Sequence, residues 1–323
     1  SETSVYIPPC IAGHVGADTA GVILSEAPYQ SSEMTLIVDV GTNAEIVLGN
    51  KDKLLACSSP TGPAFEGAQI SSGQRAAPGA IERVRINPET LEARFRVIGS
   101  ESWSDEPGFE ESIANIGISG ICGSGIIEAI AEMFLSGILS ADGVIDGEMG
   151  KKSKRILADG RTFSYLLHDG EPRILVSQND VRAIQLAKGA LYAGARLLMD
   201  RLGINSIDQI RLAGAFGSHI DVKYAMVLGL IPDCDLDKVT PVGNAAGTGA
   251  RIALLNLPSR KEIEQVVAGV EKVETATEPA FQQHFVDAMA FPHKTAAYPN
   301  LEKVVVLPAK TSESNTPHRR RRR

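Results

Sequence analysis

Length and composition place the chain among ordinary globular proteins. Its 323 residues are enough for one large domain or two smaller ones, and 43% hydrophobic against 22% charged residues excludes global disorder. The net charge is −7 although the chain ends in a run of arginines, so the rest is more acidic still, which argues against a nucleic-acid-binding surface. No apolar run approaches the ~20 residues of a membrane span, and the four cysteines form no C-x-x-C pair for zinc or an iron–sulfur cluster. We expect a cytoplasmic protein with reduced thiols and neither membrane nor nucleic-acid partners.

In chain order, the first predicted elements are antiparallel strands. Residues 35–40, 45–50 and 54–59 are apolar runs separated by short polar turns, which predicts a three-stranded meander. Residues 81–98 predict a second hairpin, and the acidic stretch 100–112 is typical of a loop.

Helices dominate the second half of the sequence. The polar stretch 141–172 predicts an irregular surface insertion, and Ser259 with Glu262 predicts a capping box for a helix over 260–270. A meander followed by alternating strands and helices predicts a mixed α/β sheet with helices on its faces. Helices are expected over 126–137, 180–202, 221–229, 244–256, 260–270 and 279–290, and strands over 173–177, 209–217 and 239–243.

The segment LIVDVGTNAEIVLG carries the first chemical motif, an aspartate at the end of an apolar strand before a tight turn into a second strand. Backbone N–H groups around Gly41, with the side chains of Thr42 and Asn43, could bind phosphate oxygens. Asp39 could hold a Mg²⁺ ion through water or orient an attacking water. The alternative is a hairpin whose Asp39 and Asn43 only make turn hydrogen bonds.

The second motif is RLAGAFGSH, a strand that runs into a glycine-rich loop and ends at His219. Gly214 and Gly217 allow a flat base or ribose to lie against the backbone, and Phe216 would shape the wall. The alternative is a closely packed strand-to-helix turn. We interpret His219 as a surface-turn residue.

Two further glycine-rich segments precede helices. In PVGNAAGTGA, Gly243 and Asn244 lie at a helix start that suits an anion or a ribose, and small-residue helix packing is the alternative. The segment GISGICGSG has the spacing G-x-x-G-x-G, which misses the dinucleotide-binding fingerprint, and no G-K-[ST] of a P-loop occurs anywhere. Cys122 within it is interpreted as a small buried residue.

The hairpin with D-x-G-T and the later Gly-Ala-Phe-Gly loop resemble the acetate and sugar kinase/Hsp70/actin superfamily, whose ATP-binding lobes are α/β folds with an RNase H-like mixed sheet and flanking helices. Longer segments resemble the C-terminal part of the reductive activators of corrinoid proteins, over most of residues 5–292. These segments are IAGHVGADTAGVILSE, DVGTNAEIVLGN, SPTGPAFEGAQISSGQRAAPGAIERV, GICGSGIIEAIAE, IQLAKGALYAGARLL, LAGAFGSHID and VGNAAGTGA.

This resemblance implies an activity. Family members couple ATP hydrolysis to electron delivery from a ferredoxin-like [2Fe-2S] domain, which reduces Co(II) to Co(I) in a corrinoid protein or a corrinoid-dependent methyltransferase. By this resemblance ATP and Mg²⁺ are the expected cofactors, and Asp39 is the expected catalytic residue and Mg²⁺ ligand, the latter through water. The expected phosphate-binding residues are Gly41, Thr42 and Asn43, and the expected adenosine-binding residues are Gly214, Ala215, Phe216, Gly217, Gly243 and Asn244.

The resemblance also implies a domain organisation. Family members carry a [2Fe-2S] domain and a first lobe with its own D-x-G-T-T loop before the region matched here. We therefore expect residues 1–34 to be the end of a preceding lobe or a connector, and 293–323 to be an extension with a basic tail. Residues 35–292 would form the nucleotide-binding lobe, with insertions near 81–112 and 141–172. Because this chain would contact ATP from one side, we expect weak or absent ATP turnover by this chain alone. The [2Fe-2S] cluster is expected only in the preceding part.

Two other functions stay open. A small-molecule kinase of the same superfamily would need an acceptor pocket with a catalytic base, and Asp39 is the only acidic residue expected at such a strand end. A non-enzymatic module would dock on the corrinoid protein without binding ATP. Dimers are common in the resembling family, which leaves a homodimer open.

Overall fold

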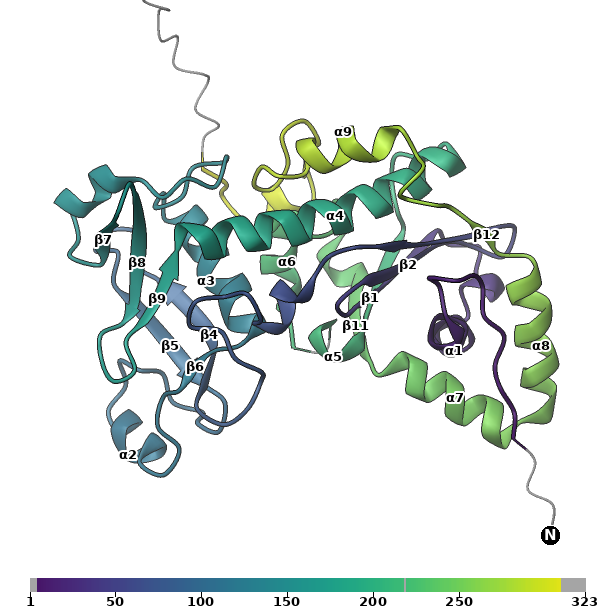
Figure 1. Cartoon of the computed structure of the whole chain (residues 1–323), viewed down its shortest axis with the longest axis horizontal. Helices are drawn as coiled ribbons and strands as arrows, with labels where there is room; N and C mark the ends of the chain where they lie inside the picture. Colours follow the sequence, from purple (N-terminus) through teal and green to yellow (C-terminus); the bar gives the residue numbers. More distant parts are fainter. Residues whose placement is uncertain (1–4, 218, 309–323) are drawn as a thin grey trace, which may run out of the picture.

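The computed structural model describes residues 5–217 and 219–308, and it consists of two packed parts joined by one long helix (Figure 1). One part is a six-stranded sheet with helices on both faces, and the other is inserted between the third strand and the long helix. Within the described ranges, no helix combines the length and the apolarity required to cross a membrane.

The six-stranded sheet has the strand order β11-β10-β1-β2-β3-β12. The predicted meander is confirmed, since β1, β2 and β3 pair in antiparallel fashion, whereas β10 and β11 extend the sheet parallel to β1. This is the mixed RNase H-like sheet expected from the sequence. The strands are β1 (Thr35–Val40), β2 (Ala44–Gly49), β3 (Leu54–Ser59), β10 (Gln209–Ala213), β11 (Val239–Gly243) and β12 (Glu271–Lys272).

Helices bury both faces of this sheet because its strands are apolar on both sides. Leu36, Val38 and Ile46 pack in the core that includes α4 (Gln178–Leu202) and α6 (Val222–Leu228). Ile37 and Val47 point to the opposite face. That face is covered by α1 (Ala17–Glu26), α7 (Ala245–Leu255) and α8 (Leu257–Ala268).

The crossing of α1 and α7 depends on two glycines. A Cβ added at Gly249 would lie 1.9 Å from the carbonyl oxygen of Gly21, and one added at Gly21 would lie 2.8 Å from the carbonyl oxygen of Ala246. The two backbones therefore touch directly, and any side chain at Gly249 would force them apart. The small-residue packing considered for the segment around Gly249 is thus present, and α1 shares one core with the sheet.

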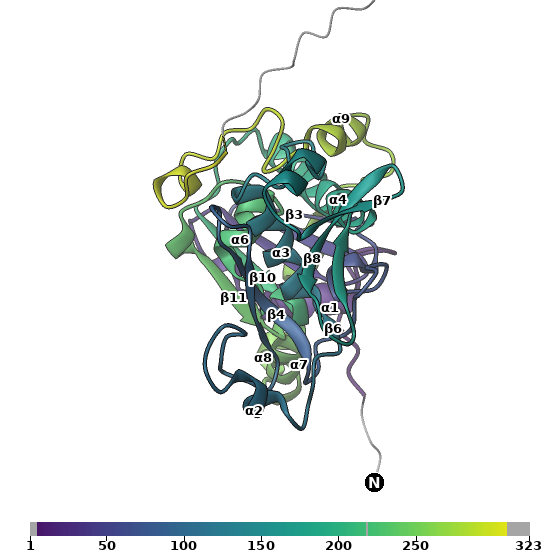
Figure 2. The same ribbon diagram turned by 90° about the vertical axis from the view of Figure 1, so that its left-hand side faces the viewer.

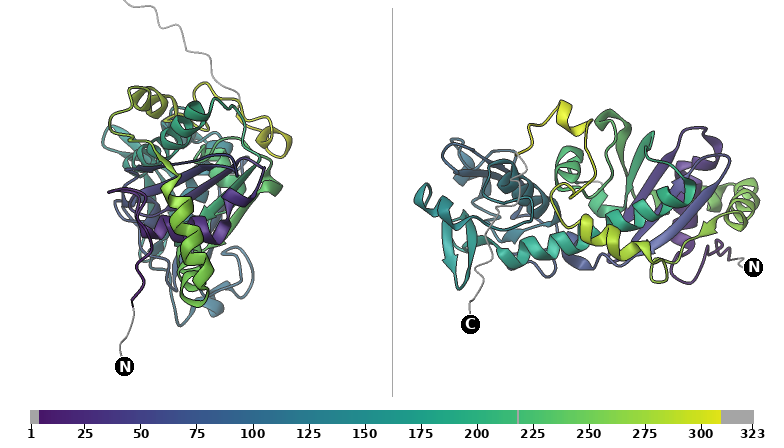
Figure 3. Two further views of the ribbon diagram at one scale, coloured as in Figure 1. Left: turned by 90° about the vertical axis from the view of Figure 1, so that its right-hand side faces the viewer. Right: turned by 90° about the horizontal axis from the view of Figure 1, so that it is seen from above.

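The long helix α4 runs from the inserted part along the sheet, with α9 (Ala280–Asp287) beside it (Figure 3). Ser177 and Asp180 form a capping box at its start, and Gly203 in the left-handed conformation ends it as predicted. On α4, the buried Lys188 donates hydrogen bonds from Nζ to the carbonyl oxygens of Ala290 (2.7 Å) and Pro292 (2.9 Å). This lysine holds the segment after α9 against the helix.

The inserted part contains two three-stranded sheets and two helices (Figure 2). The predicted hairpin over 81–98 is confirmed as β4 and β5. The stretch 141–172 is not irregular as expected, because it holds η3 (Gly147–Lys151) and two paired strands. The elements are β4 (Ala80–Ile86), β5 (Ala93–Val97), β6 (Gly120–Ile121), β7 (Ile156–Asp159), β8 (Thr162–His168), β9 (Ile174–Ser177), α2 (Phe109–Ile113) and α3 (Gly123–Leu135).

Two carboxylates of α3 replace a missing strand beside β4. The backbone N–H groups of Val84 and Ile86 donate to Glu128 (2.9 Å) and Glu132 (3.0 Å), so these two donors on the edge of β4 are satisfied. The match is geometric, because four residues of helix rise about 6 Å and two residues of strand about 6.7 Å. Glu128 is fully buried and also binds Arg83 at 2.8 Å.

One predicted helix start is wrong. The capping box of Ser259 and Glu262 does not form, because α8 begins earlier, at Leu257, with a proline in its first turn. Ser259 is buried inside that turn, and Glu262 accepts hydrogen bonds from Tyr29 and Gln30 instead. Proline at a helix start needs no N–H partner, and this outweighed the capping pattern.

Candidate functional site

The turn between β1 and β2 projects from the end of the sheet. The N–H of Gly41 donates to the carbonyl oxygen of Asn43 (2.9 Å), which closes the turn. The hydroxyl of Thr61 donates to the carbonyl oxygens of Gly41 (3.3 Å) and Thr42 (3.2 Å) and braces it from behind. The Gly41 amide is thus engaged within the turn, and the exposed Thr42 and Asn43 are the groups that can meet a ligand.

Three carboxylates gather on one face of this turn. Asp39 on β1 lies directly opposite Glu45 on β2, and Asp18 on α1 is close enough to act on both. Burial, and secondly the charge of Asp18, raises the pKa of Asp39. Burial also raises the pKa of Glu45, which Asp18 and Asp39 raise further and a hydrogen bond from Ser58 lowers.

Like charges directly across a strand pair destabilise the sheet unless a positive charge lies nearby. None of the ion pairs in the described part of the chain involves these three carboxylates. The face therefore suits a bound cation. The expectation that Asp39 is the only acidic residue at this strand end is wrong, because the register of the hairpin brings Glu45 across from it. A three-residue turn at 41–43 read from the sequence would have predicted this pairing.

The second motif meets the first at Gly214. This residue follows β10, has a φ of +84°, and would place a Cβ 2.6 Å from Oδ1 of Asp39 and 3.1 Å from the carbonyl oxygen of Val40. Only glycine fits such a conformation and such an approach. The Gly-Ala-Phe-Gly segment forms the short helix α5 (Gly214–Gly217) instead of continuing the strand to residue 217. The side chains of Ala215 and Phe216 lie outside the described part of the structure.

The third motif ends the neighbouring strand. Gly243, with a φ of +62°, ends β11, and Asn244 caps α7 by accepting a hydrogen bond from the N–H of Gly247 (2.8 Å). Because β1, β10 and β11 are parallel, their C-terminal ends meet at one edge of the sheet. Ligands bind at this edge in open α/β sheets.

A cavity of about 550 Å³ opens beside the turn. Val40, Gly41 and the exposed His219 form its sheet side, so the histidine interpreted as a surface-turn residue lies at the candidate site. The volume is within the range of small-molecule pockets. The inserted part supplies the other wall, with Phe65, Glu66, Arg75, Ala76, Cys122, Gly123 and Ser124.

Sequence reasoning missed most of the far wall. Arg75 and Glu66 lie within a segment whose glycines were noticed, but nothing local connects them to the turn at Gly41. The structure makes that connection through the hydroxyl of Thr42, which donates to Oε1 of Glu66 (3.4 Å). Cys122 is buried, as interpreted, and its Sγ contacts the carbonyl oxygen of Ile81 at 3.3 Å.

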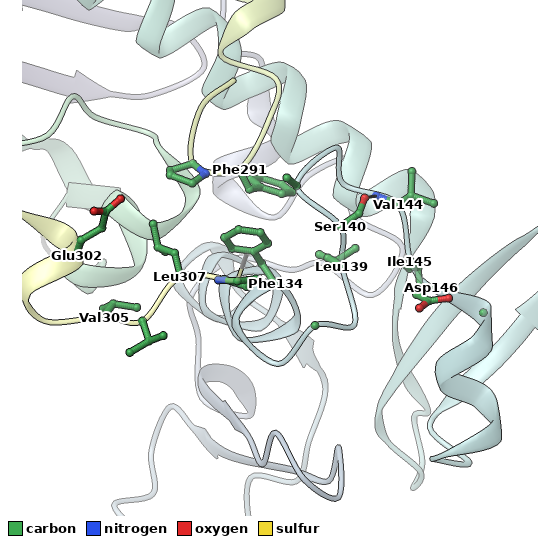
Figure 4. Close-up of a pocket in the computed structure, with 16 residues that line it drawn as sticks. Phe134, Leu139, Ser140, Val144, Ile145, Asp146, Phe291, Glu302, Val305 and Leu307 are labelled. Carbon is green, nitrogen blue, oxygen red and sulfur yellow. Dashed lines mark hydrogen bonds between the residues drawn. The ribbon is translucent and has the colours of Figure 1, made fainter. Parts of the chain in front are cut away.

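A larger cavity, of about 990 Å³, lies elsewhere, between the end of α3 and the segment after α9 (Figure 4). Phe134, Phe291 and Leu139 form its apolar walls, and the carboxylates of Asp146 and Glu302 lie toward opposite ends. None of the residues predicted to bind nucleotide lines it, and its charged groups would repel a phosphate. It is therefore not the candidate nucleotide site.

Direct metal cages are absent from the described residues, where no group of three or more His, Cys, Asp or Glu side chains converges on one point. An ion held through water needs no such group, since Mg²⁺ usually keeps several waters and takes one or two carboxylates together with substrate phosphates. Cys57, Cys122 and Cys234 are buried and unpaired, and they offer no iron–sulfur site.

Comparison with known proteins finds relatives of this chain. The chain is 34% identical over 295 residues to the corrinoid activation enzyme RamQ of Eubacterium limosum, with 88% of this chain and 46% of that protein covered. It is 27% identical over 305 residues to the [Co(II) methylated amine-specific corrinoid protein] reductase of Methanosarcina barkeri, with 90% and 52% covered. The chain thus spans about half the length of these curated relatives.

Among solved structures, a reductive activator for a corrinoid, iron–sulfur protein superposes with a TM-score of 0.77 at 34% identity, over 90% of this chain and 44% of that one. The family model described as the C-terminal domain of RACo, the ASKHA domain, matches residues 33–302. ASKHA denotes the acetate and sugar kinase/Hsp70/actin superfamily, which agrees with the sheet topology. The chain therefore belongs to the family of the RACo C-terminal ASKHA domain.

Proposed function

We propose that this chain is the nucleotide-binding part of an ATP-dependent activator that restores Co(I) in a corrinoid protein of a methyltransferase system. The observation that carries the nucleotide assignment is the contact of Gly214 with Asp39 at the shared end of β1 and β10. It joins an unneutralised acidic face and an exposed turn at one end of the sheet, and a cavity of nucleotide size opens beside Val40 and Gly41 of the same turn.

In this proposal the phosphates lie over the turn 41–43, where the Asn43 amide can donate hydrogen bonds and the Thr42 hydroxyl can do so when it leaves Glu66. Asp39 and Glu45 would hold Mg²⁺ through water, and the ion would neutralise charge on the phosphates. Burial first, and the neighbouring carboxylates second, raise the pKa of both groups, and a nearby cation would favour their charged forms. The base and ribose would lie toward Gly214–Gly217 and His219.

The corrinoid role is supported by the relatives, whose names describe corrinoid activation and reduction. A single electron converts Co(II) to Co(I), and we assign its source to a ferredoxin-like [2Fe-2S] centre outside this chain. Nucleotide can assist only through a different affinity for two conformations of the complex, which is typically a coupling of about 1–3 kcal/mol. A homodimer and a cytoplasmic location stay predictions.

Calorimetric titration tests the nucleotide assignment. Mg-ATP and Mg-ADP are titrated into the wild-type chain, into Asp39→Asn, and into Asp52→Asn, an exposed aspartate in the turn between β2 and β3 as matched control. We expect Mg-ATP to bind the wild type and the control alike, and Asp39→Asn to bind at least about tenfold more weakly. Equal binding by Asp39→Asn would refute the role of the acidic face.

A second titration separates the activator from the alternatives. The affinity of the chain for a Co(II) corrinoid protein is measured by biolayer interferometry with and without Mg-ATP. We expect the nucleotide to change this affinity, since the proposal requires coupling between the two ligands. Corrinoid-protein binding without any Mg-ATP binding would support the docking module, and Mg-ATP binding without corrinoid-protein binding would favour a kinase.

A further inference from the structure

Arg75 lies in the wall of the candidate cavity that the inserted part provides. Its side chain is exposed, and no hydrogen bond, ion pair or ring contact of its guanidinium exists among the residues that the structure describes. Glu66, the one carboxylate lining the same cavity, accepts the hydroxyl of Thr42 and forms no ion pair with Arg75. The cavity therefore contains an unneutralised cation.

The backbone around Arg75 is held firmly. The N–H of Gln74 donates to the carbonyl oxygen of Ile121 (2.9 Å), and its side-chain amide donates to Ser119 (2.9 Å). A Cβ added at Gly73 would lie 1.9 Å from the carbonyl oxygen of Gly67, so this loop also packs directly on the turn after Glu66. Arg75 thus projects from a fixed frame, so the backbone of this loop need not be ordered when the side chain binds a ligand.

Across the cavity from this frame lies the proposed phosphate turn, represented by Gly41. A phosphate group over that turn faces the carboxylates of Asp39 and Glu45 on one side, where only a metal ion can make the contact favourable. On the cavity side it faces Arg75, whose planar guanidinium can bind two phosphate oxygens at once. Phosphoryl groups are stabilised best when positive charge meets them from several directions.

We propose that Arg75 binds the phosphates of the nucleotide from the inserted part and so links that part to the sheet. The inference rests on the proposed function for the identity of the ligand, but the anion-binding role of Arg75 can be tested without nucleotide. Because Arg75 and Gly41 belong to the two different parts, a phosphate bound between them favours the arrangement in which both contacts are made.

The test compares wild type, Arg75→Ala, Arg75→Lys and Asp39→Asn, with Arg161→Ala as matched control, since Arg161 is also exposed and lacks a partner among the described residues. Mg-ATP and metal-free sodium pyrophosphate are titrated calorimetrically, and circular dichroism verifies folding. We expect Arg75→Ala to weaken both ligands by about tenfold or more, and Arg75→Lys to lose less because it keeps the charge. Asp39→Asn should weaken Mg-ATP without weakening pyrophosphate.

Each outcome decides between the two proposals. Wild-type binding of Mg-ATP that Arg75→Ala leaves unchanged overturns the role of Arg75 while the proposed function stands. The wild-type chain could bind pyrophosphate but not Mg-ATP, and Arg75→Ala could abolish the pyrophosphate binding. That outcome supports the anion site at Arg75 and counts against the nucleotide assignment. A wild-type chain that binds neither Mg-ATP nor pyrophosphate overturns both proposals. If Arg161→Ala weakens binding as much as Arg75→Ala does, the effect comes from the net charge of the protein, and the inference about Arg75 is overturned.

Discussion

Replacing Gly249 by alanine tests how closely α1 and α7 must pack. Helix propensity alone predicts that Gly249→Ala stabilises the protein by about 1 kcal/mol, since alanine is the better helix former. The structure predicts the opposite sign, because the new Cβ would lie 1.9 Å from the carbonyl oxygen and 2.4 Å from the carbonyl carbon of Gly21. The obstacle is backbone, so no side chain can rotate to make room.

The magnitude follows from the size of the overlap. Carbon atoms in contact lie about 3.5–4.0 Å apart, so the two helices must separate by more than an ångström, and the core of Val22, Ile23 and Ala253 loosens with them. Overpacking of this kind typically costs about 1–3 kcal/mol. We expect a net destabilisation of about 2 kcal/mol for Gly249→Ala. Gly21→Ala should cost less, because its Cβ would lie 2.8 Å from the nearest atom.

Urea denaturation followed by circular dichroism measures these changes as differences in the free energy of unfolding. The double variant should lose less than the sum of the single losses, because one separation of the helices relieves both overlaps. Gly269→Ala is the control, since its nearest neighbour would be 3.5 Å away. The fluorescence of Trp103, in the inserted part, should stay unchanged in the folded variants. A Gly249→Ala variant as stable as the wild type, or more stable, would refute the reasoning.

Two further predictions concern titratable groups. Burial and Asp18 raise the pKa of Asp39 above 3.8, so the charged carboxylate destabilises the folded protein at higher pH. Asp39→Asn should therefore raise the free energy of unfolding at pH 7 and lose that gain as the pH falls toward 3.8. Thermal denaturation at several pH values measures the difference between the two proteins, and a difference that does not change with pH would contradict the prediction. Burial lowers the pKa of Lys188 well below 10.5, so wild-type stability should rise with pH between the folded-state pKa and 10.5, by up to about 1.4 kcal/mol per pH unit. Lys188→Met should remove this rise in urea denaturation at pH 7, 8 and 9, and parallel curves for the two proteins would show that the amine titrates normally.

Local patterns in the sequence were sufficient for most of the secondary structure and for the fold class. The apolar runs of β1, β2 and β3 and the glycine after α4 depend on near neighbours, so their positions follow from the residues themselves. The start of α8 was predicted wrongly from the sequence, because the helix begins before the capping pattern at Ser259, with a proline in its first turn. The strands within 141–172 were missed because they are short and the segments that flank them are polar.

The candidate site divides in the same way. Asp39, Gly41, Gly214 and Gly243 were predicted from motifs because each motif is continuous in the sequence, and the structure brings all four to one edge of the sheet. Their roles in binding stay predictions. Other features depend on contacts between residues far apart in the chain, and only the tertiary structure decided them. These are the meeting of Asp18 with Asp39 and Glu45, the place of Arg75 across the cavity from Gly41, the crossing of Gly21 and Gly249, and the covering of the β4 edge by Glu128 and Glu132.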